Sequence, residues 1–346
     1  MIAWKPFGYD WNLASARLRS LLPCRQLQQA GWPCEIFQPD RLDRYQLVVF
    51  QKAYTAEDLA LATHLHQSGR KVVFDLCDNH FYQPANEAGS RERVARLNQM
   101  IDLADAVSVS TPAVAALLPH RKSVVIDDAV DDFSDAPQPG LLQRLRGQIE
   151  RHAHFRTRLV WFGNAGTEDP PFGLVDLAAI LPDLNRLNEA MSISLSVISN
   201  SRPAFERYFR SANFPVRYFD WDRRTFSSMF QRHDLCLLPI TPNPFTLCKS
   251  NNRLLLSLLL GVPVVADLIP SYEEFRPHVL CADWVNNLRL YIRNPALARQ
   301  HVAAAQACIR QQYPPERLLQ QWTGLFNSLL AVSSRVLPHV HDVPFL

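Results

Sequence analysis

The sequence predicts an α/β protein with two doubly wound, Rossmann-like domains that face a cleft, followed by a helical C-terminal tail. Short apolar runs rich in β-branched residues alternate with longer segments that have helical periodicity. One polar, proline-containing stretch at residues 131–140 (DDFSDAPQPG) interrupts the alternation, and a second series follows it. The chain has 346 residues, of which 47% are hydrophobic and 20% charged, so two separate cores are expected.

The first series predicts an N-terminal domain over residues 1–140. Its expected strands are short runs of Val, Ile and Phe, at 47–51, 71–76, 106–110 and 123–126. Three segments have apolar residues at spacings of three and four, which is typical of helices, at 16–30, 56–68 and 91–103. A connection is expected over residues 141–157.

The second series predicts a C-terminal domain over residues 158–312. Its expected strands are 158–162, 193–198, 216–219, 235–239 and 262–266, and its expected helices are 171–181, 204–212, 224–232 and 251–260. Helical periodicity from 295 to 332 is interrupted at Tyr313-Pro314-Pro315. We therefore expect residues 313–346 to form a helical tail that packs back toward the N-terminal domain.

Composition excludes several classes of protein. A net charge of +3 is too small to favour nucleic acid as a partner, and no stretch reaches the roughly 18 apolar residues of a transmembrane helix. The N-terminus lacks the basic-then-apolar pattern of a signal peptide, and the seven cysteines include no CxxC pair. We expect a cytoplasmic protein without a metal or cofactor, and leave open an action at the inner face of a membrane.

The segment Lys249-Ser250-Asn251-Asn252-Arg253 precedes an almost wholly aliphatic helix. Ser250 or Asn251 is a good N-cap, and the free N–H groups of a helix start bind anions. Lys249 and Arg253 add positive charge, and a guanidinium can form two parallel bonds to a phosphate. The alternative is that Ser250 only caps a buried helix while the two cations face solvent.

Two groups of residues in the first half are further candidates. Asp75, Asp78 and His80 lie at or just beyond the carboxyl end of the strand at 71–76, where open sheets bind ligands, and His80 is a possible general base. Alternatively, they cap loops, and two acids without a third ligand make a poor metal site. Arg17 and Arg19 begin the helix at 16–30 and either reach the cleft, to bind diphosphate or an anionic acceptor, or lie on a solvated helix face.

Other residues have structural interpretations. The aspartates at 127, 128, 131 and 132 are expected to cap turns near the connection. Trp4, Trp11 and Trp161 either stack on a sugar or base or pack in the cores.

Five segments, in order along the chain, are together similar to the retaining family 4 glycosyltransferases of the GT-B architecture. They are ASARLRSLLPCRQLQQAG, VVIDDAVDDF, RLVWFGNAGTED, VRYFDWDRRTFSSMFQRHDLCLLP and HDLCLLPITPNPFTLCKSNNRLLLSLLLGVPVVAD. The resemblance covers nearly the whole chain, and it rests on the order of the motifs more than on any one of them.

This resemblance implies metal-independent transfer of a sugar from a nucleotide diphosphate to an acceptor, which could be a sugar, a lipid-linked molecule or a protein. The C-terminal domain would bind the donor through Gly163, Asn164, Gly166, Trp221, Lys249, Ser250, Asn251, Asn252 and Arg253. The acceptor side would contain Arg17, Arg19 and Asp75. Lys249, Arg17, Asp78 and His80 would take part in catalysis.

The sequence departs from the family pattern at two points. Many members carry two glutamates on and before the helix at 251–260, and those positions correspond to Cys248 and Leu256 here. The basic pair that usually follows the first strand of the nucleotide domain is absent from GNAGTEDPPFG. These departures leave open a non-catalytic GT-B scaffold that binds a glycan or partner without the usual ribose contact. A nucleotide-sugar epimerase, with Asp75 and Asp78 near the sugar, is a third hypothesis.

Overall fold

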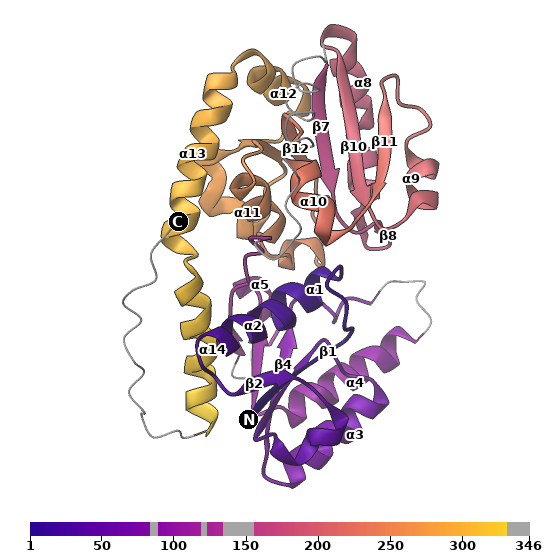
Figure 1. Ribbon diagram of the computed structural model, residues 1–346. Helices are drawn as coiled ribbons and strands as arrows, with labels where there is room; N and C mark the ends of the chain where they lie inside the picture. Colours follow the sequence, from indigo (N-terminus) through magenta and orange to yellow (C-terminus); the bar gives the residue numbers. More distant parts are fainter. Residues whose placement is uncertain (84–88, 119–122, 134–155, 331–346) are drawn as a thin grey trace.

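The computed structural model describes residues 1–83, 89–118, 123–133 and 156–330. It contains two six-stranded sheets, each made of parallel strands only. Figure 1 shows the two α/β domains one above the other, which confirms the predicted fold class. The predicted connection at 141–157, apart from its last two residues, and residues 331–346 of the tail lie outside the described residues.

The N-terminal sheet has the strand order β2-β1-β3-β4-β5-β6. Its strands are β1 (Ile2–Pro6), β2 (Cys34–Ile36), β3 (Leu47–Gln51), β4 (Lys71–Leu76), β5 (Ala106–Val109) and β6 (Ser123–Val125). Val48 and Phe50 of β3 enter one core, whereas Leu47 and Val49 enter another. Both faces of this sheet are therefore covered, as is typical of parallel sheets.

The C-terminal sheet has the order β11-β10-β7-β12-β13-β14. Its strands are β7 (Thr157–Phe162), β10 (Ile193–Ser199), β11 (Val216–Asp220), β12 (Leu235–Leu238), β13 (Val264–Ala266) and β14 (Leu280–Cys281). Val160 and Phe162 of β7 point into one core and Leu159 and Trp161 into the other, so this sheet is also buried on both faces.

The helices are α1 (Ala14–Ala16), α2 (Leu22–Gln29), α3 (Ala56–Gln67), α4 (Ser90–Leu103), α5 (Pro112–Ala115), α7 (Leu174–Ala179), α8 (Leu181–Ala190), α9 (Arg202–Tyr208), α10 (Arg223–Phe230), α11 (Asn252–Leu259), α12 (Trp284–Arg293), α13 (Pro295–Gln312) and α14 (Pro315–Leu330). A π-helical turn, η1 (Arg17–Leu21), joins α1 to α2, and 3-10 helices span η2 (Pro39–Arg44), η3 (Thr246–Cys248) and η4 (Pro270–His278).

The predicted secondary structure was wrong at three short strands and at the start of one helix. The expected strands did not include β1, β2 or β14, which are short, and in β1 the apolar run is broken by Lys5 and Pro6. The helix predicted over 171–181 begins only at Leu174, because a small hairpin of β8 (Gly166–Glu168) and β9 (Pro171–Gly173) precedes it. A Cβ at Gly166 would lie 1.8 Å from the carbonyl oxygen of Phe172, so only glycine fits that turn.

The two C-terminal helices belong to different domains. Val302, Ala305 and Ile309 of α13 pack in a core of the C-terminal domain. The helix α13 ends before Tyr313-Pro314, and the next helix, α14, runs along the N-terminal domain, as the yellow helix in Figure 1 shows. There the rings of Trp322 and Phe326 each lie 5.5 Å from the ring of Trp4, in edge-to-face geometry. The last described helix therefore completes the core beneath the first strand.

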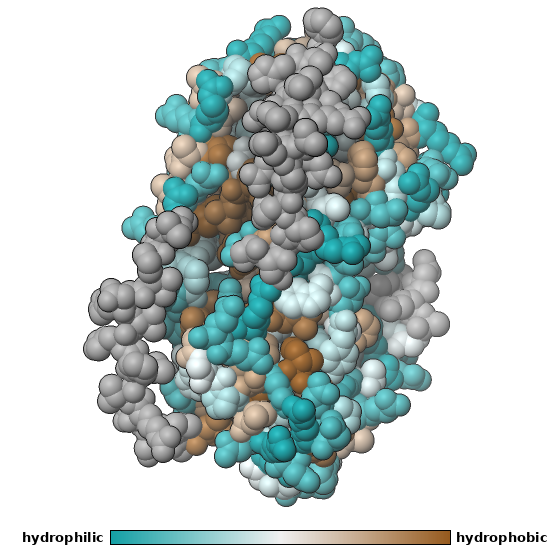
Figure 2. Space-filling view, viewed as in Figure 1, coloured by the Kyte–Doolittle hydropathy of each residue, from teal (hydrophilic) through white to brown (hydrophobic). Residues whose placement is uncertain are grey.

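The surface has a mixed character. On the face shown in Figure 2, outside the grey residues, hydrophobic side chains form separate patches between hydrophilic ones. Within the described ranges, every helix is too short or too polar to traverse a lipid bilayer.

Candidate functional site

The predicted cluster Lys249–Arg253 lies between η3 and α11 and contacts carboxylates of the N-terminal half. The Lys249 ammonium lies 2.6 Å from Asp78 Oδ1. Ser250 Oγ and Asn252 Nδ2 both donate to Asp128 Oδ2, over 2.5 and 3.0 Å. Three side chains of the cluster therefore bind carboxylates of the other domain.

Asp78 is held by lysines from both domains. Besides Lys249, the ammonium group of Lys52 lies 2.9 Å from Asp78 Oδ2. Burial alone would raise the pKa of Asp78, but the two ammonium groups outweigh it and hold this pKa well below its usual range. Asp78 is therefore ionised at neutral pH and forms a salt bridge that joins β3, β4 and the start of α11.

His80 lies beside Asp78, with Nε2 4.0 Å from its carboxylate. Its Nδ1 shares a hydrogen bond of 2.7 Å with the hydroxyl group of Tyr54. Burial, with a smaller contribution from the charge of Lys52, lowers the pKa of His80 to about 3. His80 is therefore neutral at physiological pH and a weak base.

This low pKa predicts a measurable pH dependence of stability. The unfolded chain protonates His80 near its ordinary pKa of about 6.5, whereas the folded chain does not, so stability is lost as pH falls through this range. We expect His80 to account for about 2 kcal/mol of lost unfolding free energy between pH 7 and pH 5. Denaturant titration of His80→Asn should show a correspondingly smaller loss over this range, while His66→Asn, an exposed control, should match the unmodified chain. Equal losses in all three proteins would contradict the prediction.

The start of α11 has no side-chain cap from its N-cap residue. Asn251 takes the N-cap position, one of the two predicted choices, but its side chain makes no capping hydrogen bond. Its amide nitrogen instead donates to the hydroxyl group of Tyr313 over 2.8 Å and to Glu274 over 3.1 Å. No side chain from Asn251 therefore satisfies the first N–H groups of this helix.

Arg253 is the cation of the cluster whose Nε and Nη2 atoms find no hydrogen-bond acceptor among the described residues, although its charge acts on Asp176. Its Nε and Nη2 atoms are buried and make no hydrogen bond. The guanidinium carbon lies 5.1 Å from the ring centroid of Trp161 and 5.3 Å from that of Phe162. Buried donors without acceptors cost free energy, so this geometry is typical of a site prepared for an anion. For Arg253, the alternative of a cation facing solvent is wrong.

The end of β7 lies directly beside this guanidinium. A Cβ added to Gly163 would lie 3.4 Å from Arg253 Cζ and 3.2 Å from the ring of Trp161. Because glycine has no side chain, the Arg253 guanidinium packs close to the backbone at position 163. In the following loop, Asn164 Oδ1 accepts from the Gly166 N–H over 2.8 Å, so that N–H is already bonded within the loop.

Trp221 lies between the donor-side residues and the N-terminal domain. Its ring stacks on Phe162 with centroids 6.1 Å apart and lies 4.1 Å from Phe226. On the other side, the guanidinium group of Arg17 lies 5.4 Å from its centroid. Trp161 and Trp4 are fully buried, as the core interpretation predicted, while Trp11 is 37% exposed.

Arg17 and Arg19 are both buried, with exposed fractions of 2% and 1%, so the hypothesis of a solvated helix face is wrong. The π-helical turn explains why residues two apart both point inward. Arg17 pairs with Asp131 over 2.9 Å and donates to the carbonyl oxygen of Trp11 over 2.6 Å. Asp131 also binds Arg223 of α10 over 2.6 Å, so one carboxylate joins the two domains.

Arg19 and Asp75 bind each other. Arg19 Nη2 lies 2.5 Å and Nε 3.1 Å from the two carboxylate oxygens of Asp75, whose exposed fraction is 0%. Ser108 also donates to this carboxylate over 2.7 Å. The predicted acceptor-side role of these two residues stays a prediction, and the geometry favours a structural one.

Sequence reasoning missed several contributors to this site. Asp131 caps a turn, as predicted, by accepting from the Phe133 N–H over 3.1 Å. Asp128 and Asp131 also bind side chains of the C-terminal domain, which the turn-cap prediction does not include. Lys52 was not singled out, although it follows β3 directly at the carboxyl edge of the sheet. Its backbone φ is 53°, a value that is unusual for a residue other than glycine. Residues in such conformations are concentrated at functional sites.

The positions of the two missing glutamates are apolar. Leu256 packs against a core of the C-terminal domain, and Cys248 is buried in a core of the N-terminal domain. Among the described residues, no group of three His, Cys, Asp or Glu side chains could hold a metal ion.

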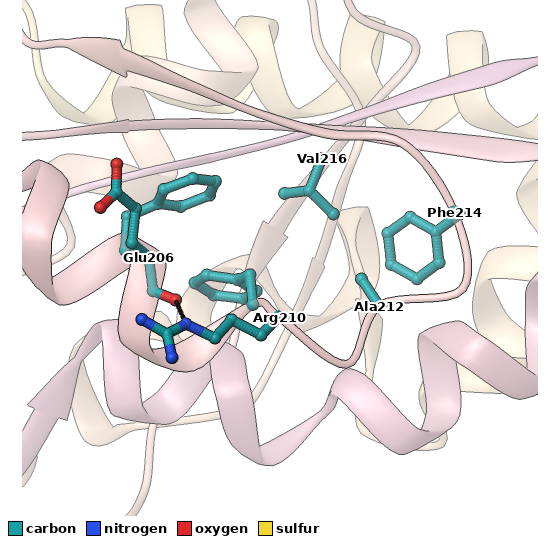
Figure 3. Close-up of a pocket in the computed structure, with 7 residues that line it drawn as sticks. Glu206, Arg210, Ala212, Phe214 and Val216 are labelled. Carbon is teal, nitrogen blue, oxygen red and sulfur yellow. Dashed lines mark hydrogen bonds between the residues drawn. The ribbon is translucent and has the colours of Figure 1, made fainter.

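A separate pocket of about 490 Å³ lies on the C-terminal domain between α9 and the edge strand β11. Figure 3 shows that Glu206, Arg210, Ala212, Phe214 and Val216 surround it. Val216 begins β11, so the pocket lies at the amino end of the sheet, opposite to Gly163. The switch-point rule for open sheets therefore does not favour this pocket as the ligand site.

Comparisons with known proteins agree with this architecture. No protein-family model and no curated protein matches the chain. Among solved structures, sucrose-phosphate synthase from Thermosynechococcus elongatus is 15% identical, with a TM-score of 0.70 over 96% of this chain and 99% of that one. HepE from Anabaena, solved in complex with UDP, is 15% identical, with a TM-score of 0.66 over 94% and 99%. A glycosyltransferase from Rickettsia africae is 11% identical, with a TM-score of 0.64 over 96% and 98%.

At these identities the likeness establishes the fold. The chain has the GT-B architecture, as the sequence predicted. Membership of family 4 stays a prediction.

Proposed function

We propose that this chain is a cytoplasmic glycosyltransferase that moves a sugar from a nucleoside diphosphate donor to an acceptor. The observation that carries the proposal is the buried, unpaired guanidinium of Arg253 at the uncapped start of α11, beside Gly163. An anion with two oxygens satisfies both orphan nitrogens at once. A diphosphate is such an anion, and HepE, whose structure is similar, was solved with UDP.

The chemistry follows from the charge that develops during transfer. As the bond between sugar and phosphate breaks, negative charge grows on the leaving diphosphate, and fixed donors stabilise it in the transition state. Arg253 and the N–H groups of α11 supply fixed positive charge here, so we propose transfer without a metal. We also propose retention of configuration, on the resemblance of the sequence to retaining enzymes.

Lys249 would join the diphosphate by exchanging its carboxylate partner. Its ammonium group binds Asp78 over 2.6 Å, and it also lies 4.0 Å from the ring centroid of Phe245. Release of Asp78 by Lys249 would leave that carboxylate ionised and paired with Lys52, beside the neutral His80. Asp78 and His80 are therefore the groups that we propose to orient the sugar or acceptor hydroxyls.

The test is a binding and turnover experiment on the full chain. Calorimetric titration with UDP, GDP, ADP and dTDP is expected to show one-to-one binding of at least one of them. The corresponding nucleotide sugar is then expected to release its diphosphate when acceptors are added. An absence of binding for all four nucleotides would refute the proposal.

Specific contacts also favour a second candidate function, that of a non-catalytic scaffold. Lys249, Ser250 and Asn252 are all bound to carboxylates across the cleft, and Leu256 offers no ribose contact. A non-catalytic GT-B scaffold needs no more than this. Nucleotide binding without turnover on any donor and acceptor pair would favour a scaffold that retains a nucleotide. Nucleotide binding that depends on Arg253, with turnover, would favour the enzyme.

A further inference from the structure

The loop between β1 and α1 exposes aromatic rings. Six large hydrophobic side chains are exposed in the described part of the chain, and its three aromatic members are Phe7, Tyr9 and Trp11. Phe7 is 64% exposed and Tyr9 57% exposed. Exposed rings gathered within five residues indicate a binding surface more strongly than the same number of scattered ones.

This loop is held in place despite its exposure. The Phe7 N–H donates to the carbonyl oxygen of Gln51 over 2.8 Å, which fixes the start of the loop. Asn12 Oδ1 accepts from the backbone N–H of Arg223, on α10 of the C-terminal domain, over 3.0 Å. The Trp11 ring lies 5.1 Å from the guanidinium of Arg223. Trp11 and Asn12 therefore anchor the loop to the other domain, while Phe7 and Tyr9 remain open.

The same loop is connected to the proposed donor site by direct contacts. Trp11 accepts a hydrogen bond from Arg17, whose guanidinium lies over Trp221. Trp221 stacks on Phe162, and Phe162 contacts Arg253. A chain of direct contacts therefore runs from Trp11 in the aromatic loop to Arg253.

The polar surroundings of the rings favour one class of ligand. Asp10 lies exposed between Tyr9 and Trp11, and its Oδ1 accepts from the Asn12 N–H over 2.8 Å. The charge of Asp58 also acts on Tyr9, but Asp58 is buried and paired with Lys5. Carboxylates repel an anionic membrane surface, and they accept hydrogen bonds from hydroxyl groups. Aromatic faces carry partial negative charge and attract the weakly positive C–H groups of a sugar ring. A ring face with a carboxylate beside it suits a neutral saccharide.

We propose that Phe7 and Tyr9 form an acceptor subsite in which the apolar face of a neutral sugar ring stacks on the aromatic side chains and its hydroxyl groups donate to Asp10. This inference rests on the proposed function, because it supplies the saccharide acceptor for that transfer. It excludes a lipid surface as the group bound by this loop.

The test is saturation-transfer NMR on the full chain with methyl glycosides of glucose, galactose, mannose and N-acetylglucosamine, with and without UDP. We expect transfer to the ring C–H protons of at least one glycoside. Phe7→Ala and Tyr9→Ala are each expected to weaken its binding by about tenfold, while Tyr9→Phe retains the stacking. Leu290→Ala, which removes an exposed side chain from α12, is the matched control and should bind like the unmodified chain.

The outcomes separate this inference from the proposed function. Glycoside binding that depends on both rings supports the subsite even if no nucleotide binds, and in that case only the proposed function fails. Nucleotide binding without any glycoside binding overturns the subsite and leaves the proposed function intact. Sedimentation with phosphatidylcholine and phosphatidylglycerol vesicles that depends on Phe7 and Tyr9, without glycoside binding, overturns it in favour of a membrane contact.

Discussion

Replacing Arg253 with methionine is expected to weaken nucleoside diphosphate binding by about 100-fold, because hydrogen bonds to a charged group each contribute about 1.5–3 kcal/mol. The same change is expected to leave the unfolding free energy unaltered or to raise it. Its Nε and Nη2 atoms make no hydrogen bond within the described residues, so no protein hydrogen bond is lost. Calorimetry with UDP and thermal denaturation of the same samples measure the two effects together.

Replacing a binding residue lowers ligand affinity without lowering the unfolding free energy, whereas replacing a structural residue lowers the unfolding free energy. Arg253→Lys keeps the charge but loses the planar pair of donors, so its affinity should fall between those of arginine and methionine. Arg224→Met is a suitable control, because Arg224 is a surface residue paired with Asp222 over 2.9 Å. A methionine variant that is destabilised and still binds UDP with unchanged affinity would contradict the assignment of Arg253 to the donor site.

The largest expected effect on stability belongs to the buried pair of Arg19 and Asp75. Arg19→Met leaves the buried carboxylate of Asp75 without a cation, and Asp75→Asn leaves buried Arg19 with only the longer pairing to Asp128 at 3.4 Å. Each change is therefore expected to lower the unfolding free energy by about 3–5 kcal/mol. Arg19 also donates to the carbonyl oxygens of Ile126 and Asp127, which fixes the segment that leads out of the N-terminal domain. Denaturant titration at neutral pH measures both losses.

A double-mutant cycle tests the cause of these losses. If uncompensated charge is responsible, the double variant should be less destabilised than the sum of the single variants. Lys71, whose ammonium group pairs with Asp105 over 2.8 Å and is 38% exposed, offers a control in Lys71→Met, with a loss of about 1 kcal/mol or less. Single variants at Arg19 and Asp75 that lose no more than this control would show that the pair does not stabilise the fold.

Much of the fold could be predicted because its signals are local. The strands β3 and β4 have the predicted bounds, and α11 differs by one residue at each end from its predicted range. The apolar runs of β3 and β4 are buried on both faces of the sheet, so consecutive apolar residues indicate a strand. The strand β1 was missed because Lys5 and Pro6 shorten its apolar run, although Trp4 is fully buried.

The candidate site was predicted only in part, because its partners are distant in the sequence. The polar cluster before α11 could be recognised as a site, but the pairing of Lys249 with Asp78 joins residues 171 positions apart. Local patterns likewise could not show that Arg253 lacks a partner, since this depends on the packing of Trp161 and Phe162 around it. Sequence therefore indicated the residue types, and the tertiary contacts decided which of them is free to bind.

The return of α14 to the N-terminal domain has a consequence for how the protein is made. During translation the first sheet leaves the ribosome early, with Ile2 and Trp4 ready to pack. The residues that cover them, Leu318, Trp322 and Phe326, are among the last described residues to be synthesised. This apolar face therefore stays exposed while the entire C-terminal domain is translated. Nascent chains with exposed apolar surface bind chaperones or aggregate. The N-terminal domain is therefore the first to be synthesised, but its core is complete only after α14 has been synthesised.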